Sequence, residues 1–190
     1  SINVLKESFS GKLLSGLESK SILIPESVIN AYLKRRLSKE HLTLKKMSCN
    51  TNGMSIEVIA KKLGGLAKFT LKANLVIEDF ELSSNKHEAR ISIEGDKVQG
   101  STLLGKIGLF IIELIVGDIL ACEIVHYKNV ELEYDPSGKI AKIDLRTIPQ
   151  VDKLYMGHPL IMDGKRLIDL ISIDRIEHEE GGMRLFLCMV

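Results

Sequence analysis

The sequence predicts a single α+β domain over residues 1–190, in which a long, curved and mostly antiparallel β-sheet wraps around a long apolar helix at about residues 101–121. Three observations lead to this prediction. Apolar and polar residues alternate with a period of two over several long segments, as in strands that bury one face. One segment between these strands is apolar on all sides, which is typical of a buried helix. The 190 residues contain neither an internal repeat nor a linker, which suits one domain.

One or two helices are expected before the sheet. Apolar residues spaced three or four apart predict an amphipathic helix over residues 2–18, although two glycines weaken it. The next helix has clearer signals, because Pro25 suits the first helical position and Glu26 suits the positive N-terminal end of the helix dipole. An apolar stripe then continues to Leu37.

The alternation that is typical of strands begins after this helix. Turn signals at residues 50–53 and 83–86 separate the strand segments. The longest segment covers residues 67–78, where all six positions on one face are apolar and four of the six on the other face are charged or amide residues. Such a segment is a long strand with one buried face. The same pattern continues over residues 89–94.

The apolar helix at about residues 101–121 comes next, and strands return after it. Alternation at residues 129–134 and 142–146 indicates two more strands. Residues 148–165 show no regular pattern. Residues 167–190 predict a terminal hairpin around a Glu-Glu-Gly-Gly turn.

The stretch at residues 107–125 is long enough to span a bilayer. It is interrupted by Glu113, Asp118 and Glu123, and each acid would cost roughly 2.5–3.5 kcal/mol near the bilayer centre. At about 100° per residue these acids point in three directions, so no single face of the helix can shelter them. We therefore expect a buried helix and no transmembrane segment.

The charge is distributed unevenly, although the formal net charge is only +1. Residues 1–75 contain 13 Lys and Arg against 5 Asp and Glu, a formal charge of +8, and residues 76–190 contain 13 against 20, a formal charge of −7. Either the basic half offers a surface to anionic lipid, or the two halves attract each other within one fold. With no Trp and few other aromatic residues, a nucleic-acid partner is not expected.

The cysteine pattern signals neither a metal site nor a disulfide framework. Cys49, Cys122 and Cys188 are far apart, and no C-x-x-C motif occurs. The odd count mildly favours a reducing compartment. The chain begins at Ser1 rather than Met, which suggests a processed or trimmed form, so the lack of a signal peptide says nothing about export. The location is therefore left open between a soluble protein and one peripheral to a membrane.

A phosphate-binding motif is approached but not completed at Gly100–Lys106. The segment Gly100-Ser-Thr-Leu-Leu-Gly105-Lys106 has the spacing G-x-x-x-x-G-K between a strand and a helix. However, Ile107 stands where a Ser or Thr hydroxyl would hold Mg²⁺, and long antiparallel strands replace repeated βαβ units. A nucleotide-dependent enzyme that uses this segment is therefore only a minor alternative.

No metal site and no catalytic residue are expected. His178-Glu179 begins an H-E-x-x-H zinc motif, but Gly182 occupies the position of the second histidine. The other histidines are isolated in the sequence, and no carboxylate pair stands out from the solvated strand faces. We therefore expect a protein that is not an enzyme and that holds no cofactor.

The long one-sided sheet and the very apolar helix together lead to the central hypothesis. If the helix leaves part of the concave sheet face open, an elongated apolar groove remains, and it suits an acyl chain because burial of each CH₂ yields about 0.8 kcal/mol. If the helix fills that face, no groove exists. The residues expected to line the groove are Leu71, Leu75, Ile77, Ile91 and Ile93 on the sheet and Leu109, Phe110 and Ile112 on the helix.

Four segments follow one another as a short helix and then long strands: Ile24-Pro-Glu-Ser-Val-Ile-Asn-Ala-Tyr-Leu33, Asn52-Gly-Met-Ser-Ile-Glu-Val58, Phe69–Phe80 and Ala89–Glu94. This order of elements, over about residues 22–135, resembles the tubular lipid-binding superfamily, particularly its small bacterial single-domain members. The resemblance implies a sheet that wraps the helix at 101–121 and binding of lipids or other apolar ligands, often next to a membrane. It implies no catalytic residues. Residues 148–165 and the terminal hairpin depart from it.

The leading hypothesis is a non-enzymatic protein that binds a lipid or another hydrophobic small molecule next to a membrane. The alternative is a structural or interaction module with a filled core, which acts through a sheet edge or an oligomer face. In the leading hypothesis, basic residues contribute about 1 kcal/mol each near an anionic surface. The basic residues expected to face such a membrane are Lys34, Arg35, Arg36, Lys61 and Lys62.

Overall fold

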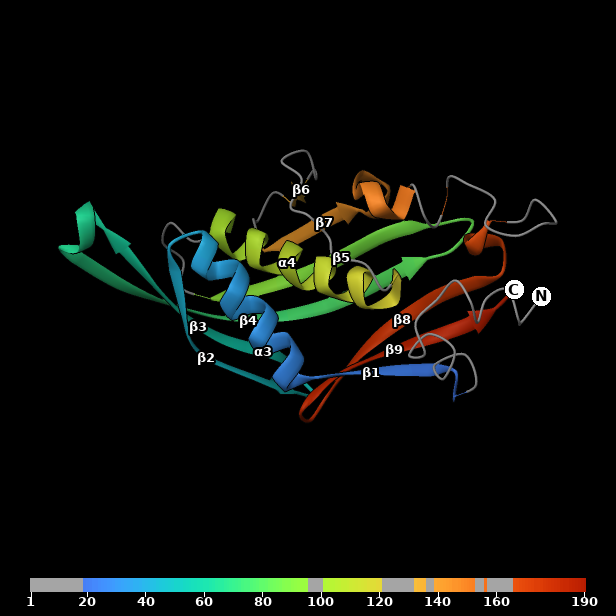
Figure 1. The fold of residues 1–190 in the computed structure, drawn as a ribbon, viewed down its shortest axis with the longest axis horizontal. Helices are drawn as coiled ribbons and strands as arrows, with labels where there is room; N and C mark the ends of the chain where they lie inside the picture. The colour runs from blue at the N-terminus through green and yellow to red at the C-terminus, as the bar shows by residue number, and fades with distance from the viewer. Residues whose placement is uncertain (1–18, 96–100, 121–131, 136–138, 153–155, 157–165) are drawn as a thin grey trace.

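The computed structural model describes residues 19–95, 101–120, 132–135, 139–152, 156 and 166–190, and these form a large sheet with two helices on one face (Figure 1). The helix predicted at residues 2–18 lies outside the described residues. In chain order the helices and strands are β1 (Ser21–Pro25), α3 (Glu26–Lys39), β2 (Leu42–Asn50), β3 (Gly53–Lys62), β4 (Ala67–Leu82), β5 (His87–Gly95), α4 (Ser101–Leu120), β6 (Leu132–Tyr134), β7 (Ile140–Asp144), β8 (Ile171–Glu179) and β9 (Gly182–Met189).

The strands of the described chain belong to one sheet. Its order is β1-β9-β8-β4-β5-β7-β6, with β3 also paired with β4 and β2 paired with β3. Every strand pairing within the described residues is antiparallel. The prediction of an α+β protein with a large antiparallel sheet is therefore confirmed.

The strand β4 connects the two ends of this sheet. Its residues 67–75 pair with β3, its residues 73–82 pair with β5, and Leu82 pairs with Ile173 of β8. A bulge between Ile77 and Asp79 shifts the alternation by one residue, so that Phe80 and Leu82 also face the core. The strand therefore continues to Leu82, although the alternation that predicted it at 67–78 is broken at the bulge.

The start of α3 is held by hydrogen bonds to other elements rather than by an N-cap side chain. The helix follows Pro25, which makes no side-chain cap. The backbone N–H of Glu26 donates instead to the carbonyl of Gly181 in the β8–β9 turn, at 2.8 Å. The Glu26 carboxylate accepts the N–H of Cys49 at 2.7 Å, and the N–H of Gly181 donates to the Cys49 carbonyl at 3.2 Å. These three hydrogen bonds join α3, β2 and the β8–β9 turn.

The helix α4 is the predicted apolar helix, and it ends within one residue of the expected boundary. All ten residues from 107 to 116 are buried, so the helix is covered on every face instead of along one stripe. It packs mainly against α3, β5 and β7. Gly108 permits close approach, since a Cβ there would lie 2.8 Å from Cδ1 of Ile91. The prediction that the sheet wraps around this helix is not confirmed.

Glu113 is buried within this stretch. It is one of the three acids for which no transmembrane segment was expected. None of the helices in the described part of the chain is long and apolar enough to cross a bilayer.

Candidate functional site

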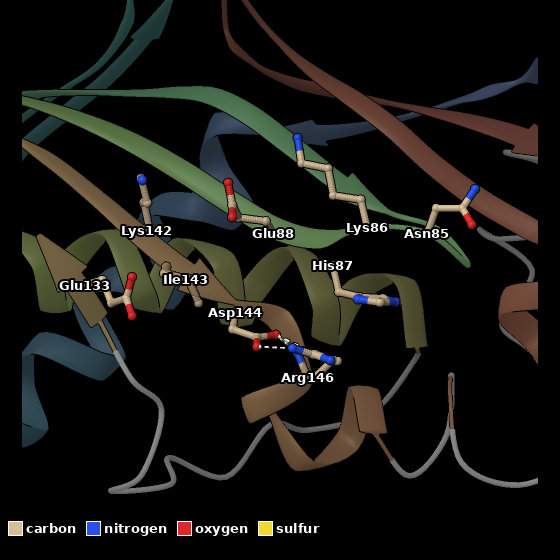
Figure 2. Close-up of a pocket in the computed structure, with 9 residues that line it drawn as sticks. All are labelled: Asn85, Lys86, His87, Glu88, Glu133, Lys142, Ile143, Asp144 and Arg146. Carbon is tan, nitrogen blue, oxygen red and sulfur yellow. Dashed lines mark hydrogen bonds and ion pairs between the residues drawn. The ribbon is translucent and has the colours of Figure 1, made fainter. Parts of the chain in front are cut away.

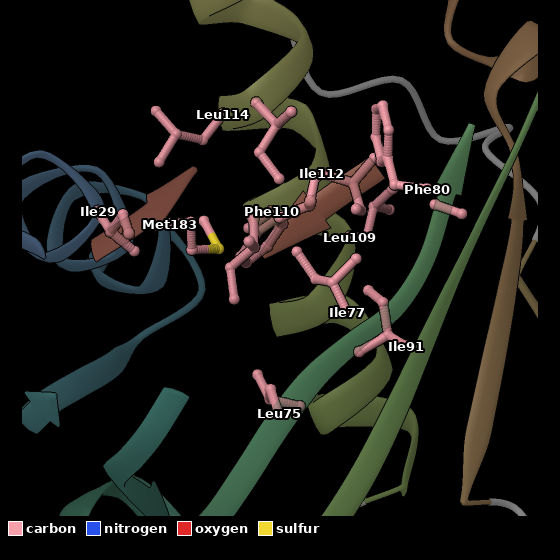
Figure 3. Packing of buried hydrophobic residues seen from close by; sticks show 14 of the residues in the cluster. Ile29, Leu75, Ile77, Phe80, Ile91, Leu109, Phe110, Ile112, Leu114 and Met183 are labelled. Carbon is pink, nitrogen blue, oxygen red and sulfur yellow. The ribbon is translucent and has the colours of Figure 1, made fainter. Parts of the chain in front are cut away.

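The residues predicted to line a groove come together in the interior of the protein. Each of them has an exposed fraction of 5% or less, and all belong to one hydrophobic cluster. The period of two places the strand residues on the face of the sheet that α4 covers. Those that Figure 3 labels lie between the helix and the sheet, from Leu75, Ile77 and Ile91 on the strands to Leu109, Phe110 and Ile112 on α4. The members of this set, which we call the inner layer, are Leu71, Leu75 and Ile77 of β4, Ile91 and Ile93 of β5, and Leu109, Phe110 and Ile112 of α4.

The basic residues predicted to face a membrane differ in their exposure. Lys34 and Arg35 are exposed on α3, and Lys61 is exposed near the end of β3. The side chain of Lys62 is outside the described part. Arg36 is only 8% exposed, so its assignment to a membrane-facing surface is wrong. The error arises because Arg36 follows Leu33 by three residues and so lies on the helix side that faces α4.

Arg36 is paired with Glu113 inside the protein. Its Nη2 lies 2.9 Å from Oε2 of Glu113, and the side chains of the two residues are 9% and 1% exposed. The guanidinium also lies over the ring of Phe110, with its carbon 4.6 Å from the ring centre. A charged pair so deeply buried loses most of its hydration and needs many hydrogen bonds to offset that loss.

The polar surroundings of this pair are only partly complete. Tyr32, one turn before Arg36 on α3, is half-buried and hydrogen-bonds to Glu113; burial, reinforced by the negative charge of Glu113, raises the pKa of Tyr32 to about 12. The Nε of Arg36 is buried and has no hydrogen-bond partner among the described residues. We call Tyr32, Arg36 and Glu113 the polar cluster. Sequence reasoning missed it, although an acid among the apolar residues 107–116 is a signal that a basic partner is needed.

One open pocket of about 440 Å³ lies beside β5, β6 and β7 (Figure 2). Its basic and acidic side chains balance, and Asp144 and Arg146 already satisfy each other through two hydrogen bonds at 3.1 and 2.8 Å. Hydrogen bonds from Arg146 lower the pKa of Asp144. This recess suits solvent better than an apolar ligand. Its lining residues are Asn85, Lys86, His87, Glu88, Glu133, Lys142, Ile143, Asp144 and Arg146.

A second open pocket of about 460 Å³ lies over β2, β3 and β4. Seven of its nine lining residues have polar side chains, and the other two are Ile56 and Ala73. The residues are Lys46, Ser48, Ser55, Ile56, Glu57, Lys72, Ala73, Asn74 and Glu94. Neither pocket contains a member of the inner layer or of the polar cluster.

The phosphate-loop motif does not form a loop in its described part. Residues 101–106 are helical, so the N–H groups of Gly105 and Lys106 lie within a helix instead of being free to surround a phosphate. The hydroxyl of Tyr134 lies where a Cβ of residue 105 would be, so Gly105 has a packing role. The ammonium of Lys106 lies 3.9 Å from the carboxylate of Glu40. Gly100 is outside the described residues.

No protein-family model, no curated protein and no solved structure matches this chain. The resemblance to the tubular lipid-binding superfamily therefore stays a prediction.

The β3–β4 hairpin ends in an exposed segment, of which sequence reasoning singled out only Lys61 and Lys62. It projects from the body of the protein (Figure 1), and its turn contains Gly64 and Gly65 at φ of 65° and 98°, which glycine adopts readily. Leu66 is 91% exposed and Phe69 is 39% exposed. Residues 58–77 contain four Lys and no Asp or Glu, and this acid-free run was the available signal. We call residues 61–70 the arm.

The two cysteines in the described part of the chain differ in exposure. Cys49 is buried, and burial raises its pKa to about 11, so that the thiol stays protonated near neutral pH. Cys188 is exposed, and Cys122 lies outside the described residues. Within the part of the chain described, no group of three His, Cys, Asp or Glu residues is arranged to hold a metal ion.

Proposed function

We propose that this chain is a non-enzymatic binding protein that takes up a lipid or another apolar small molecule between α4 and the face of β4 and β5. The observation that carries the proposal is the burial of α4 on all sides, with Glu113 as the charged residue within residues 107–116. A ligand that enters beside this helix meets apolar side chains from both layers. The sheet would curve around α4 and the ligand together.

Ligand uptake exchanges contacts within the inner layer for contacts with the ligand. Apolar contacts are not directional, so a flexible chain can replace part of them without leaving unpaired polar groups. Each CH₂ that leaves water contributes about 0.8 kcal/mol. A long acyl chain therefore provides enough free energy to separate α4 slightly from the strands.

The arm supports a location next to an anionic membrane. Exposed Leu66 and Phe69 offer apolar side chains at the end of a hairpin, and Lys61 and Lys68 stand beside them with no acid nearby in the sequence. Apolar tips that enter the headgroup region and lysines that contact anionic lipids act together in peripheral membrane binding. Such a surface would bring the protein to the source of its ligand.

Native mass spectrometry of the purified protein tests the proposal, followed by denaturing extraction and lipid analysis. We expect an additional mass that leaves the protein on denaturation and is identified as a fatty acid or a phospholipid. A mass for the chain alone, together with no displacement of a fluorescent acyl probe by any added lipid, would contradict the proposal.

The second candidate is an interaction module with a filled core, and the low exposure of the inner layer favours it. β2 lies at one edge of the sheet, where exposed Lys45 and Lys46 are typical of an edge protected from uncontrolled pairing. The same mass spectrum separates the two candidates. A stable homo-oligomer without extractable lipid supports the interaction module, and a lipid-loaded chain supports the binding protein.

A further inference from the structure

We propose that Arg36 receives the carboxylate of an acyl ligand, so that the protein selects long-chain carboxylic acids over neutral lipids of the same length. This inference rests on the proposed function. The site would be formed by the polar cluster of Tyr32, Arg36 and Glu113, at the contact between α3 and α4.

The first argument is the incomplete hydrogen bonding of Arg36. A guanidinium carries five N–H donors and no acceptor. The described residues provide Arg36 with Glu113 as a hydrogen-bond partner, through Nη2 at 2.9 Å, while Nε is buried with none. A buried donor without an acceptor lowers stability, and such an exception calls for an explanation. A ligand carboxylate would supply the acceptor.

The second argument is the position of Arg36 relative to the inner layer. Its guanidinium lies over the ring of Phe110, which is a member of that layer. A carboxylate bound at Nε would therefore place the first carbons of its chain near Phe110, at the edge of the inner layer. Headgroup and chain sites are then continuous, as a single ligand requires.

The third argument concerns the chemical class of the headgroup. The charges of Arg36 and Glu113 cancel, so a bound carboxylate gives the cluster a net charge of −1. Arg35 partly offsets this charge, because its guanidinium carbon lies 5.5 Å from the centre of the Tyr32 ring. A planar carboxylate matches the geometry of a guanidinium edge. A phospholipid headgroup needs more room than a carboxylate does beside a side chain that is only 9% exposed.

Glu113 has a distinct part in this arrangement, because it is an internal carboxylate bound to the same guanidinium. It keeps Arg36 paired when the ligand is absent, and it competes with the ligand for N–H donors. Glu113→Gln keeps the size of the side chain and removes its charge. Acid binding to this variant should therefore be tighter than to the natural chain.

The test compares palmitic acid with methyl palmitate, each displacing a neutral fluorescent acyl probe from the full chain. We expect the acid to bind about tenfold more tightly than the ester, as hydrogen bonds to a charged partner typically allow. The preference should increase in Glu113→Gln. It should disappear in Arg36→Gln/Glu113→Gln, where affinity for the ester is retained. The double variant is used because Arg36→Gln alone would leave the buried Glu113 charge unpaired.

Lys34→Gln is the matched control, since it removes an exposed basic residue from the same helix that has no part in the polar cluster, and it should keep the preference. Circular dichroism checks that each variant is folded, and the comparison of acid with ester in the natural chain needs no variant. If neither acid nor ester binds, the proposed function itself is overturned. If both bind equally, or if the preference survives in the double variant, the assignment to Arg36 is wrong while the binding function stands.

Discussion

The side chain of His178 accepts a hydrogen bond from a backbone N–H of β4 where β4 and β8 are not paired. The described pairing of these strands is at Leu82 and Ile173, and the backbone N–H of Ile77 donates instead to Nε2 of His178, at 2.8 Å. An imidazole that accepts through Nε2 is neutral and carries its proton on Nδ1. Burial lowers the pKa of His178, which agrees with this neutral state.

His178→Ala should lower the free energy of unfolding by about 1–3 kcal/mol at pH 7.5, because the N–H of Ile77 loses its acceptor. The deficit should shrink as the pH falls below the ordinary histidine value of about 6.5. In that range His178 binds a proton in the unfolded natural chain but not in the folded one, so the free energy of unfolding of the natural chain decreases. The variant lacks His178 and does not show this decrease.

Urea unfolding of both proteins at pH 7.5 and pH 5.5 measures the effect. His87, whose pKa is also lowered by burial, is present in both proteins and cancels in the difference. A deficit that is equal at the two pH values would show that His178 does not accept from Ile77. The sequence could not predict this contact, because donor and acceptor are 101 positions apart.

The arm exposes two large apolar side chains, Leu66 and Phe69, at the end of a hairpin, and exposed apolar surface of this kind often marks a binding site. Leu66→Ser/Phe69→Ser should abolish cosedimentation with vesicles of mixed neutral and anionic phospholipid. Its folding should be nearly unchanged, because exposed positions usually alter stability by less than about 0.5 kcal/mol. Added salt should weaken the binding of the natural chain, because lysines supply part of it.

Leu23→Ser provides the control for this experiment. Leu23 is 41% exposed on β1, which lies far from the arm (Figure 1), so its loss should leave vesicle binding intact. Equal binding by the arm variant and the natural chain would remove the arm from any membrane contact. Binding to purely neutral vesicles with the same affinity would exclude the lysines as contributors.

The close seating of α4 on β5 can be measured with a double-mutant cycle. Gly108→Ala gains about 1 kcal/mol in helix propensity, but its Cβ would lie 2.8 Å from Cδ1 of Ile91. Ile91→Val removes that methyl group and alone should cost about 0.5–1.5 kcal/mol. The double variant should be more stable than the sum of the single effects, by about 0.5–3 kcal/mol. Additive effects would show that α4 does not rest on Ile91.

The helices and strands followed from the sequence where the local period was unbroken. α4 and the first part of β4 are such cases, because one apolar pattern runs through each of them. The bulge after Ile77 hid the end of β4, since one extra residue reverses the faces of all later side chains. The pairing of Arg36 with Glu113 was hidden for a different reason: it joins two helices that are 77 residues apart.

The whole molecule is held together at two places that the local pattern does not reveal. β4 belongs to the ladder of β3 and to that of β5, and it touches β8 at Leu82. The hydrogen bonds among Glu26, Cys49 and Gly181 then join α3, β2 and the β8–β9 turn. The class of the fold could be predicted because it depends on pattern. The arrangement of the two ends of the sheet could not, because it depends on contacts between distant residues.

Glu26→Ala tests whether these two connections make one cooperative unit. The variant loses the acceptor of the Cys49 N–H and should lower the free energy of unfolding by about 1–3 kcal/mol. Unfolding should nevertheless remain a single transition, because β4 still connects both ends of the sheet. Urea transitions followed by far-ultraviolet circular dichroism and by tyrosine fluorescence should therefore coincide. Two separated transitions in the variant would mean that Glu26, and not β4, couples the β8–β9 end to the rest of the sheet.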